Sequence, residues 1–515
     1  MGILTVAVVT VLWWAGTRGL DGKELVSARL ESLKVGLSIG IGGGGMFALY
    51  LAWRRQRSTE ADLDNRERTL EHQQLVASKT EAYQDRVAAA AETDSAARRV
   101  TELYAKAADL LGSNKAPVRL AGLYAFERLA QDNPDAPNLR QTVVNVLCAY
   151  LRMSYPMPSS LASESDDDAT RNRVSELADE SIHEREVRLT AQRILTGHLR
   201  HGEDDDNPSI TFWEDVDIDL TGATLIDLDF TCCFARTAIF AKAIFVGTTR
   251  LDKAAFAKLA VFDRAKFDGP ADFEEVEFEQ GSSFKEVTFS DYTGFSRTKF
   301  KGNTSFYKAM FSGTSFNMTM FDGAAEFQES RFIGFTSFLG PLFSENADFH
   351  NVTFERSVNL MMTFRKLAGF QGATFNEGVQ FSADFWGDAR FDRSTFHGEV
   401  HLGGDFCGDA SFTGATVHGS LLFHSFRPMK GMFHFQKLKV LGDVNFGETE
   451  FQGKVNFDNA DFGGNVELNR ATFSRGLTFS GARFRGEVHL DRSSFKGPLP
   501  TELGEYSDRE VNNED

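Results

Sequence analysis

Phenylalanine recurs with a short, fixed period through the second half of this chain. From Phe256 to Phe495 the gaps between large apolar residues alternate between five and six. Of the 48 Phe residues, all but Phe47 and Phe126 lie between Phe212 and Phe495, so the pattern is a repeated unit and not general hydrophobicity. A short period sustained over this length predicts a solenoid, in which each unit buries its apolar residue only against its neighbours.

A small or β-branched residue stands two positions before most of the large ones, as Ala260 does before Phe262 and Ala271 before Phe273. Residues two apart on an extended segment point the same way, so both should face a narrow, filled interior. The residues between them are polar or charged and suit solvated faces. The predicted solenoid core includes Phe262, Phe267, Phe273, Phe278, Phe451, Phe457, Phe462, Phe473, Phe479, Phe484 and Phe495.

This small-x-large pattern resembles the pentapeptide-repeat family, and the stretches 219–225 and 238–245 fit its plain five-residue form. The resemblance implies a right-handed, four-sided β-helix with half-coils of about 11 residues and coils of about 22. Roughly 240 residues would give about 11 coils and a rod of about 50 Å at the ~4.8 Å strand spacing. The register is irregular at 360–364, 381–391 and 423–435, where we expect bulges or small loops.

Other repeat folds fit the pattern less well. Leucine-rich repeats need recurring L-x-x-L-x-L clusters, and a left-handed hexapeptide helix needs an unbroken period of six. A β-sandwich would show longer strands at irregular spacing.

Residues 1–53 predict two transmembrane helices. Val35–Trp53 holds 19 residues without a charge, close to the ~20 needed to cross a bilayer, and Arg54, Arg55 and Arg57 follow at once. Ile3–Ala15 is shorter and fits a second span or a signal peptide. Two spans place the protein in the cell membrane as a multi-pass protein with its carboxy-terminal domain in the cytoplasm.

Three glycines at four-residue spacing, Gly36, Gly40 and Gly44, lie in the second predicted span. Such spacing lets two helix backbones approach closely, which predicts packing of the two spans or a homodimer. The alternative is a span that is merely rich in glycine, because Gly42 to Gly45 is itself a run of four.

The remaining chain divides by composition. Residues 54–99 predict a polar helical linker, either a coiled coil through Leu63, Leu70 and Ala77 or a single solvated helix. Residues 100–201 predict a small helical domain whose last helix, Ser181–Arg200, caps the first coil. The loop 156–168 is expected to be disordered, the acidic run 203–206 opens the solenoid domain (202–500), and 501–515 predicts an acidic disordered tail. The stretch 108–130 resembles the segment that precedes the repeats in bacterial two-span membrane proteins.

The sequence contains no motif for catalysis and none for a cofactor or metal, so we expect a protein that is not an enzyme. Four Cys residues show no metal-ligand spacing and no disulfide framework. Five histidines, His397, His401, His418, His424 and His434, are close in sequence, but a 22-residue coil would not stack them on one another.

The net charge of −18 argues against a protein that binds nucleic acid over its whole surface. The expected function is therefore a membrane-anchored scaffold that binds an unknown protein partner through its solenoid. The alternative is an acidic DNA mimic that binds a topoisomerase, suggested by acidic edges such as Glu274, Glu275, Glu277 and Glu279. Residues 211–500 carry a net charge of only about −8, far less dense than the one charge per ~1.7 Å of DNA.

Overall fold

A computed structural model describes residues 2–19, 22–155, 168–202, 209–425, 427–496 and 499–504. The chain forms two compact units, residues 1–101 and 102–515. The predicted loop at 156–168 lies outside the described residues except for Asp168, and so does the acidic run 203–206.

The first unit is helical. It holds α1 (Gly2–Gly16) and most of α2 (Lys23–Leu111), a single helix of 89 residues. The second predicted span, the polar linker and the first turns of the helical domain are thus one uninterrupted helix. Leu70 and Ala77 are exposed on α2, and the side chain of Leu63 lies outside the described set. Over the described residues, no helix is both long and apolar enough to cross a bilayer.

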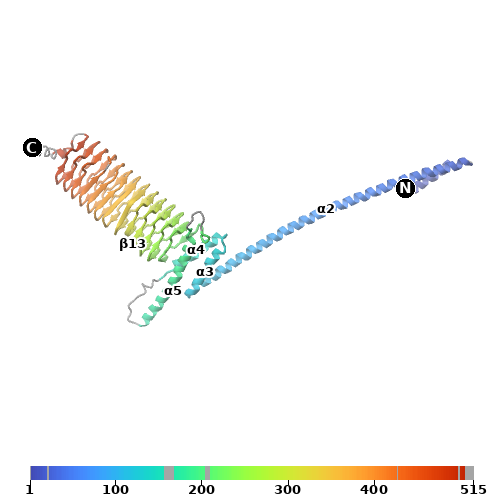
Figure 1. Cartoon of the computed structure of the whole chain (residues 1–515), viewed down its shortest axis with the longest axis horizontal. Coiled ribbons are helices and arrows are strands. Elements are labelled where there is room, and N and C mark those ends of the chain that lie inside the picture. The colour runs from blue at the N-terminus through green and yellow to red at the C-terminus, as the bar shows by residue number, and fades with distance from the viewer. Residues whose placement is uncertain are drawn as a thin grey trace. The chain divides into compact units, whose positions relative to one another are not determined.

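The second unit begins with a small bundle formed by α3 (Ala116–Gln131), α4 (Pro137–Arg152) and α5 (Asp168–Leu199). Proline stands in the first turn of α3 and of α4, where its missing N–H costs nothing. The three helices bury one another's apolar faces through residues that include Leu123, Phe126, Val143, Leu147, Val187 and Leu195. In Figure 1 this bundle lies at the amino-terminal end of the solenoid.

The solenoid winds through four parallel ladders of short strands, which we name ladders A to D. Ladder A runs through 13 strands from β1 (Asp217–Asp219) to β42 (Leu477–Thr478), and ladder B from β2 (Thr224–Ile226) to β43 (Arg483–Phe484). Ladder C runs from β6 (Thr249–Arg250) to β44 (Val488–His489), and ladder D from β3 (Phe234–Ala235) to β45 (Ser494–Phe495). The four-sided β-solenoid is confirmed. Its 13 turns exceed the predicted 11 because the first coils use Leu, Ile and Ala where the later ones use Phe.

Stacked rings fill the interior. On ladder A, Phe262, Phe284, Phe306, Phe327 and Phe349 lie on one another with ring centroids 4.8 to 4.9 Å apart and nearly parallel planes. Rings from neighbouring ladders meet edge to face, as Phe267 and Phe273 do at 5.8 Å. Both arrangements are favourable for aromatic pairs. Of the eleven predicted core phenylalanines, nine are buried, and Phe484 and Phe495, in the last coil, are half-buried.

Two kinds of corner explain the alternating gaps. In the regular stretch from Lys253 to Lys308, each five-residue gap contains a tight turn in which a middle residue has positive φ. The six-residue gaps of this stretch contain a corner without such a residue. Between Lys253 and Lys308 these left-handed residues recur every 11 positions, which matches the predicted half-coil: Lys253, Arg264, Glu275, Glu286, Arg297 and Lys308. A non-glycine residue in this conformation costs roughly 1–2 kcal/mol. Here the backbone N–H of that residue bonds to the next coil, as Arg264 N does to Lys285 O at 2.7 Å.

Coil length varies from 20 to 23 residues along the ladders. The register shifts lie between Phe289 and Tyr292 and between Leu339 and Leu342, where no irregularity was predicted. In the predicted region 360–364 the chain instead forms one long strand, β23 (Val358–Phe364), which passes from ladder C to ladder D. In the third region the coil lengthens to 23 residues between Ala410 and Phe433.

Two glutamines cap the open edge of the first coil. Gln141 of α4 donates to Asp217 O (2.8 Å) and accepts from Asp217 N (2.9 Å). Gln192 of α5 makes the same pair of bonds with Ile226 (2.8 and 2.9 Å). Each side-chain amide therefore takes the place of the missing preceding strand and satisfies an edge that would otherwise be unpaired. The predicted capping by the Ser181–Arg200 helix is confirmed, and α4 shares the task.

The other end of the solenoid is covered by the chain that follows it. Residues Thr501–Leu503 form one turn of 3-10 helix, and Leu503 is fully buried. The prediction of a disordered tail beginning at 501 is therefore wrong for this turn, because Leu503 covers apolar surface of the last coils. Residues 505–515 lie outside the described residues.

Glycine is required where the backbones of successive coils approach most closely. Gly398, Gly419, Gly442 and Gly464 form a column at the corner between ladders B and C. A Cβ atom at Gly419 would lie 2.5 Å from Gly398 O, so we expect Gly419→Ala to cost about 1–3 kcal/mol through overpacking. Thermal unfolding of the full chain should show a lower melting temperature. Gly281→Ala is the matched control, since its Cβ would meet nothing closer than 3.6 Å; equal effects would contradict the steric explanation.

Removing a glutamine cap should loosen the first coil. Gln192→Leu keeps the volume of the side chain but leaves the N–H and C=O of Ile226 without partners, at about 1–3 kcal/mol each. Hydrogen exchange followed by mass spectrometry should show faster exchange in peptides covering 224–226. Gln380→Leu, at an exposed glutamine of ladder C, should leave exchange there unchanged. Unaltered protection in Gln192→Leu would show that the amide does not act as a strand.

Candidate interaction surface

A continuous groove follows the outer face of ladder C. Its first part, of about 510 Å³, extends from Phe335 to His401, and its second part, of about 1080 Å³, from Gln380 to Asp491. The two parts share Gln380 and His401, so they form one groove along the solenoid axis. Its floor is shaped by β26 (Val379–Ser382), β30 (Val400–Gly403) and β33 (Leu421–His424), which pair in register.

Exposed apolar side chains gather at the amino-terminal part of this face. Phe335 is 70% exposed, Tyr292 48%, Leu339 46% and Met361 44%. Tyr292 and Phe335 stand at the same corner two coils apart, with Gly313 between them. A Cβ at Gly313 would lie 3.7 Å from Tyr292 Cδ2, so the Tyr292 ring lies beside this glycine. Contiguous exposed apolar side chains of this kind mark interaction sites on soluble surfaces.

The register shifts place these residues. The extra residue between Phe289 and Tyr292 lets β13 (Thr288–Gly294) continue around a corner from ladder B to ladder C. The shift at Leu339–Leu342 does the same for β20 (Thr336–Phe343), from ladder C to ladder D. Bulges often turn a side chain outward beside functional sites. The residue added at each register shift therefore leaves Tyr292 and Leu339 outside the core.

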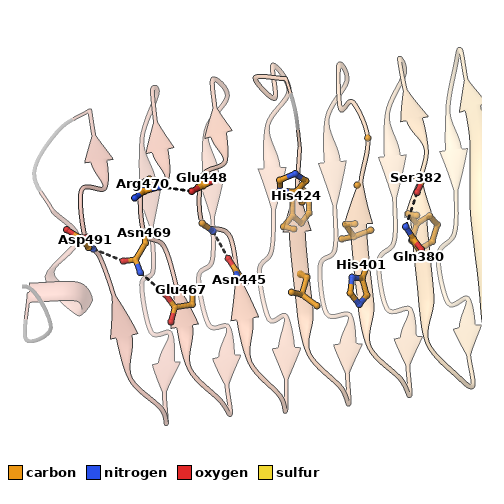
Figure 2. A pocket seen from close by; sticks show the side chains of 17 residues that line it. Gln380, Ser382, His401, His424, Asn445, Glu448, Glu467, Asn469, Arg470 and Asp491 are labelled. Carbon is orange, nitrogen blue, oxygen red and sulfur yellow. Dashed lines mark hydrogen bonds and ion pairs between the residues drawn. The ribbon is translucent and has the colours of Figure 1, made fainter.

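The carboxy-terminal part of the groove is polar. Figure 2 shows His401, His424, Asn445, Glu467 and Asn469 along successive strands. Asn469 donates to Glu467 at 2.8 Å and accepts from the backbone N–H of Asp491 at 2.7 Å. Arg470 pairs with Glu448 at 2.8 Å across one coil. These bonds fix the polar side chains in a regular array that continues the apolar part.

Charge distinguishes the first part of the groove from the other faces. Among the residues lining it, Glu399 is the one carboxylate, and none is Lys or Arg. Ladder D, by contrast, carries rows of ion pairs between coils, such as Lys299–Glu277 at 2.5 Å and Lys301–Glu279 at 2.6 Å. The hydrogen bond from Lys299 lowers the pKa of the Glu277 carboxyl. The centres of protein interfaces are likewise depleted in charge and enriched in aromatic residues and Met.

The acidic edge that suggested a DNA mimic is largely paired. Glu274 and Glu275 both contact Arg297, and Glu277 and Glu279 contact the lysines of the next coil. This acidic coil is thus followed by a coil with basic residues at the facing positions. The local field is weaker than the run of acidic residues in the sequence indicates.

The histidines are arranged differently from the prediction. The coils near them hold 21 residues and not 22, so His397 falls on His418, and their rings stack with centroids 4.8 Å apart. His401 pairs with Leu422. Within the described residues, no group of three or more His, Cys, Asp and Glu side chains could hold a metal ion.

The predicted glycine contact is shown at one position. In the first unit, a Cβ at Gly36 would lie 2.6 Å from Val9 Cγ2, so Gly36 lets α2 approach α1 closely. The surroundings of Gly40 and Gly44 lie outside the described set. Phe335 was missed as a surface residue, although its three-residue spacing from Phe332 and Phe338 breaks the five-and-six pattern.

Comparison with known proteins supports the repeat. The sequence model of the pentapeptide-repeat family, described as pentapeptide repeats in 9 copies, matches residues 251–299 and 435–483. Both ranges lie in the four ladders. Comparisons with curated proteins and with solved structures found no match. The solenoid therefore carries pentapeptide repeats, and the similarity to bacterial two-span membrane proteins stays a prediction.

Thiol reactivity can test which cysteines are accessible to solvent. Cys407 is exposed on ladder D beside Trp386, whereas burial raises the pKa of the Cys148 thiol to about 11. A raised pKa leaves little thiolate near neutral pH, so maleimide at pH 7.5 should label Cys407 quickly and Cys148 hardly at all. Mass spectrometry of tryptic peptides measures both, with denatured protein as the control in which all four thiols react. Rapid labelling of Cys148 in the native protein would contradict the packing of α4.

Proposed function

We propose that this chain is a non-enzymatic protein-interaction module that binds a protein partner through the outer face of ladder C. One observation carries the proposal: exposed Phe335, Tyr292, Leu339 and Met361 lie at the first part of the groove, whose lining holds one carboxylate and no Lys or Arg, on a solenoid whose neighbouring face carries rows of ion pairs.

The physical argument concerns the cost of exposure. Apolar surface in water costs about 25 cal/mol per Å², and a partner that covers it recovers that free energy. A rigid ladder also loses little conformational freedom on binding, which favours affinity. The shallow, elongated shape of the groove suits a protein segment better than a small substrate, which needs a concave site that encloses it.

We further propose, from the sequence, that the first unit attaches the protein to the cell membrane and leaves the solenoid in the cytoplasm. The uncharged stretch Val35–Trp53 and the three arginines that follow it support this proposal. Reporter fusions after Lys34 and after Arg57 test it: a periplasmic signal from the second fusion would reverse the topology. A chain released from the membrane fraction by high salt alone would argue against an integral anchor.

The partner can be captured at a defined position. A photo-crosslinking amino acid in place of Phe335 should form a discrete crosslinked species in cells of the source organism. The matched control replaces Trp386, an aromatic residue of similar exposure (63%) on ladder D, and should give little product. Mass spectrometry identifies the attached protein. Equal crosslinking at both positions would show that ladder C is not a preferred face.

A substitution at the same position should weaken binding without unfolding the protein. Phe335→Asp places a carboxylate at the first part of the groove, whose lining offers no Lys or Arg to pair with it, and we expect at least a tenfold loss of the Phe335-dependent complex in pull-down experiments, because an unpaired charge would have to be desolvated. Trp386→Asp should leave the complex and the melting temperature unchanged. If instead a topoisomerase is recovered and the chain inhibits supercoiling equally well with Phe335→Asp, the DNA-mimic alternative would replace this proposal.

A further inference from the structure

A second recess lies in the helical bundle, away from ladder C. It encloses about 750 Å³ between the last turns of α2 and the helices α3, α4 and α5. Its walls are mostly apolar and include Tyr104, Leu111, Phe126, Val146 and Ala149. This volume lies within the range of pockets that hold small molecules.

A charged cluster stands in the wall of this recess. Arg188 is 1% exposed and donates to Glu184 (3.0 Å), to Leu151 O (3.0 Å) and to Met153 O (2.6 Å). Arg119 donates to the same Glu184 carboxylate at 2.9 Å and to Ser113 O at 3.0 Å. The hydroxyl of Tyr150 also donates to Glu184. One carboxylate therefore accepts bonds from two guanidinium groups and a phenol.

The formal charge of the buried cluster does not balance. Among its buried and half-buried groups, Arg119 and Arg188 contribute two positive charges and Glu184 one negative charge, whereas Glu180, the other carboxylate of the lining, is exposed to solvent. Within the described part of the chain, the buried Nε of Arg119 has no hydrogen-bond partner. The Arg119 side chain is 12% exposed, so its outer edge remains within reach of a ligand. Burying an uncompensated charge is costly, and an anion in the recess would remove that cost.

We propose that this recess binds an anion with an apolar chain, of the class of long-chain carboxylates. The carboxylate would lie against Arg119, and guanidinium groups bind carboxylates through paired, charge-assisted hydrogen bonds. The chain would lie along Tyr104, Val146 and Ala149. Glu180 is exposed and is the one other ionisable group besides the tyrosines in the lining, so it weakens binding of an anion without occupying the apolar wall.

The test uses the purified full chain with 11-(dansylamino)undecanoate as a fluorescent probe. Laurate should displace the probe at a concentration at least tenfold lower than dodecyltrimethylammonium or dodecanol, which have the same chain length but no negative charge. Dodecyl phosphate tests whether any anionic head suffices. Displacement by the cation as efficient as that by laurate would overturn the proposal.

Substitutions in the wall test whether the probe binds in the recess. Arg119→Met should weaken laurate binding at least tenfold, Arg119→Lys should retain part of it, and Glu180→Gln should strengthen it. Ala149→Trp fills the apolar wall and should abolish it. Circular dichroism verifies folding of each variant. Wild-type affinity in folded Arg119→Met or Ala149→Trp would overturn the proposal, and if Arg119→Met does not fold, Ala149→Trp and Glu180→Gln decide. Phe335→Asp should bind laurate normally, which separates this site from the groove on ladder C.

Discussion

Stacking of like side chains in successive coils is the constraint from which the solenoid follows. Each ring rests on its counterpart one coil away, and the backbone hydrogen bonds between coils hold that spacing. A ring cannot bury its two faces within its own coil, because only the rings of the coils on either side cover them. The unit of stability is consequently the contact between coils, as in other repeat proteins. The left-handed corner residues and the glycine columns are consequences of this, since both let one backbone follow closely on the next.

The same constraint explains why changes in coil length do so little damage. Coils of 20 to 23 residues keep the inward positions aligned and absorb the difference at the corners. Where a residue is added at a corner and the strand continues through it, as beside Tyr292, an apolar side chain moves outside. The irregular positions thus create the features of the surface, while the regular ones build the core. The groove on ladder C has a floor of regularly paired strands, and the irregular positions lie at its edge.

The sequence predicted the core well because its information is periodic. Phe262 and Phe273 are recognisable from their spacing and from the alanine two positions earlier, and both are buried. Surface features depend on which coil lies next to which, and an error of one residue per coil shifts every cross-coil pair. That is why a 22-residue period separated His397 from His418, although they stack. Gln141 and Gln192 could not be identified in advance either, because a glutamine whose amide pairs with a strand edge does not change the sequence pattern of the helix that carries it.

The division between α1, α2 and the remaining chain shows a different limit. Composition separates an apolar stretch, a polar stretch and a helical domain, yet α2 crosses all three without a break, because it contains no proline and even its glycine run does not end the helix. Composition reports the surroundings that a segment prefers. It does not report where an element ends.

The glutamine caps have a consequence for how such a protein can change over generations. They contact only the first coil, and Leu503 covers only the opposite end, so neither closure depends on how many coils lie between. A duplication or deletion of one whole coil in the gene would leave both closures intact and would alter the rod by about 4.8 Å. The length of the solenoid can therefore change by whole coils without loss of either closure.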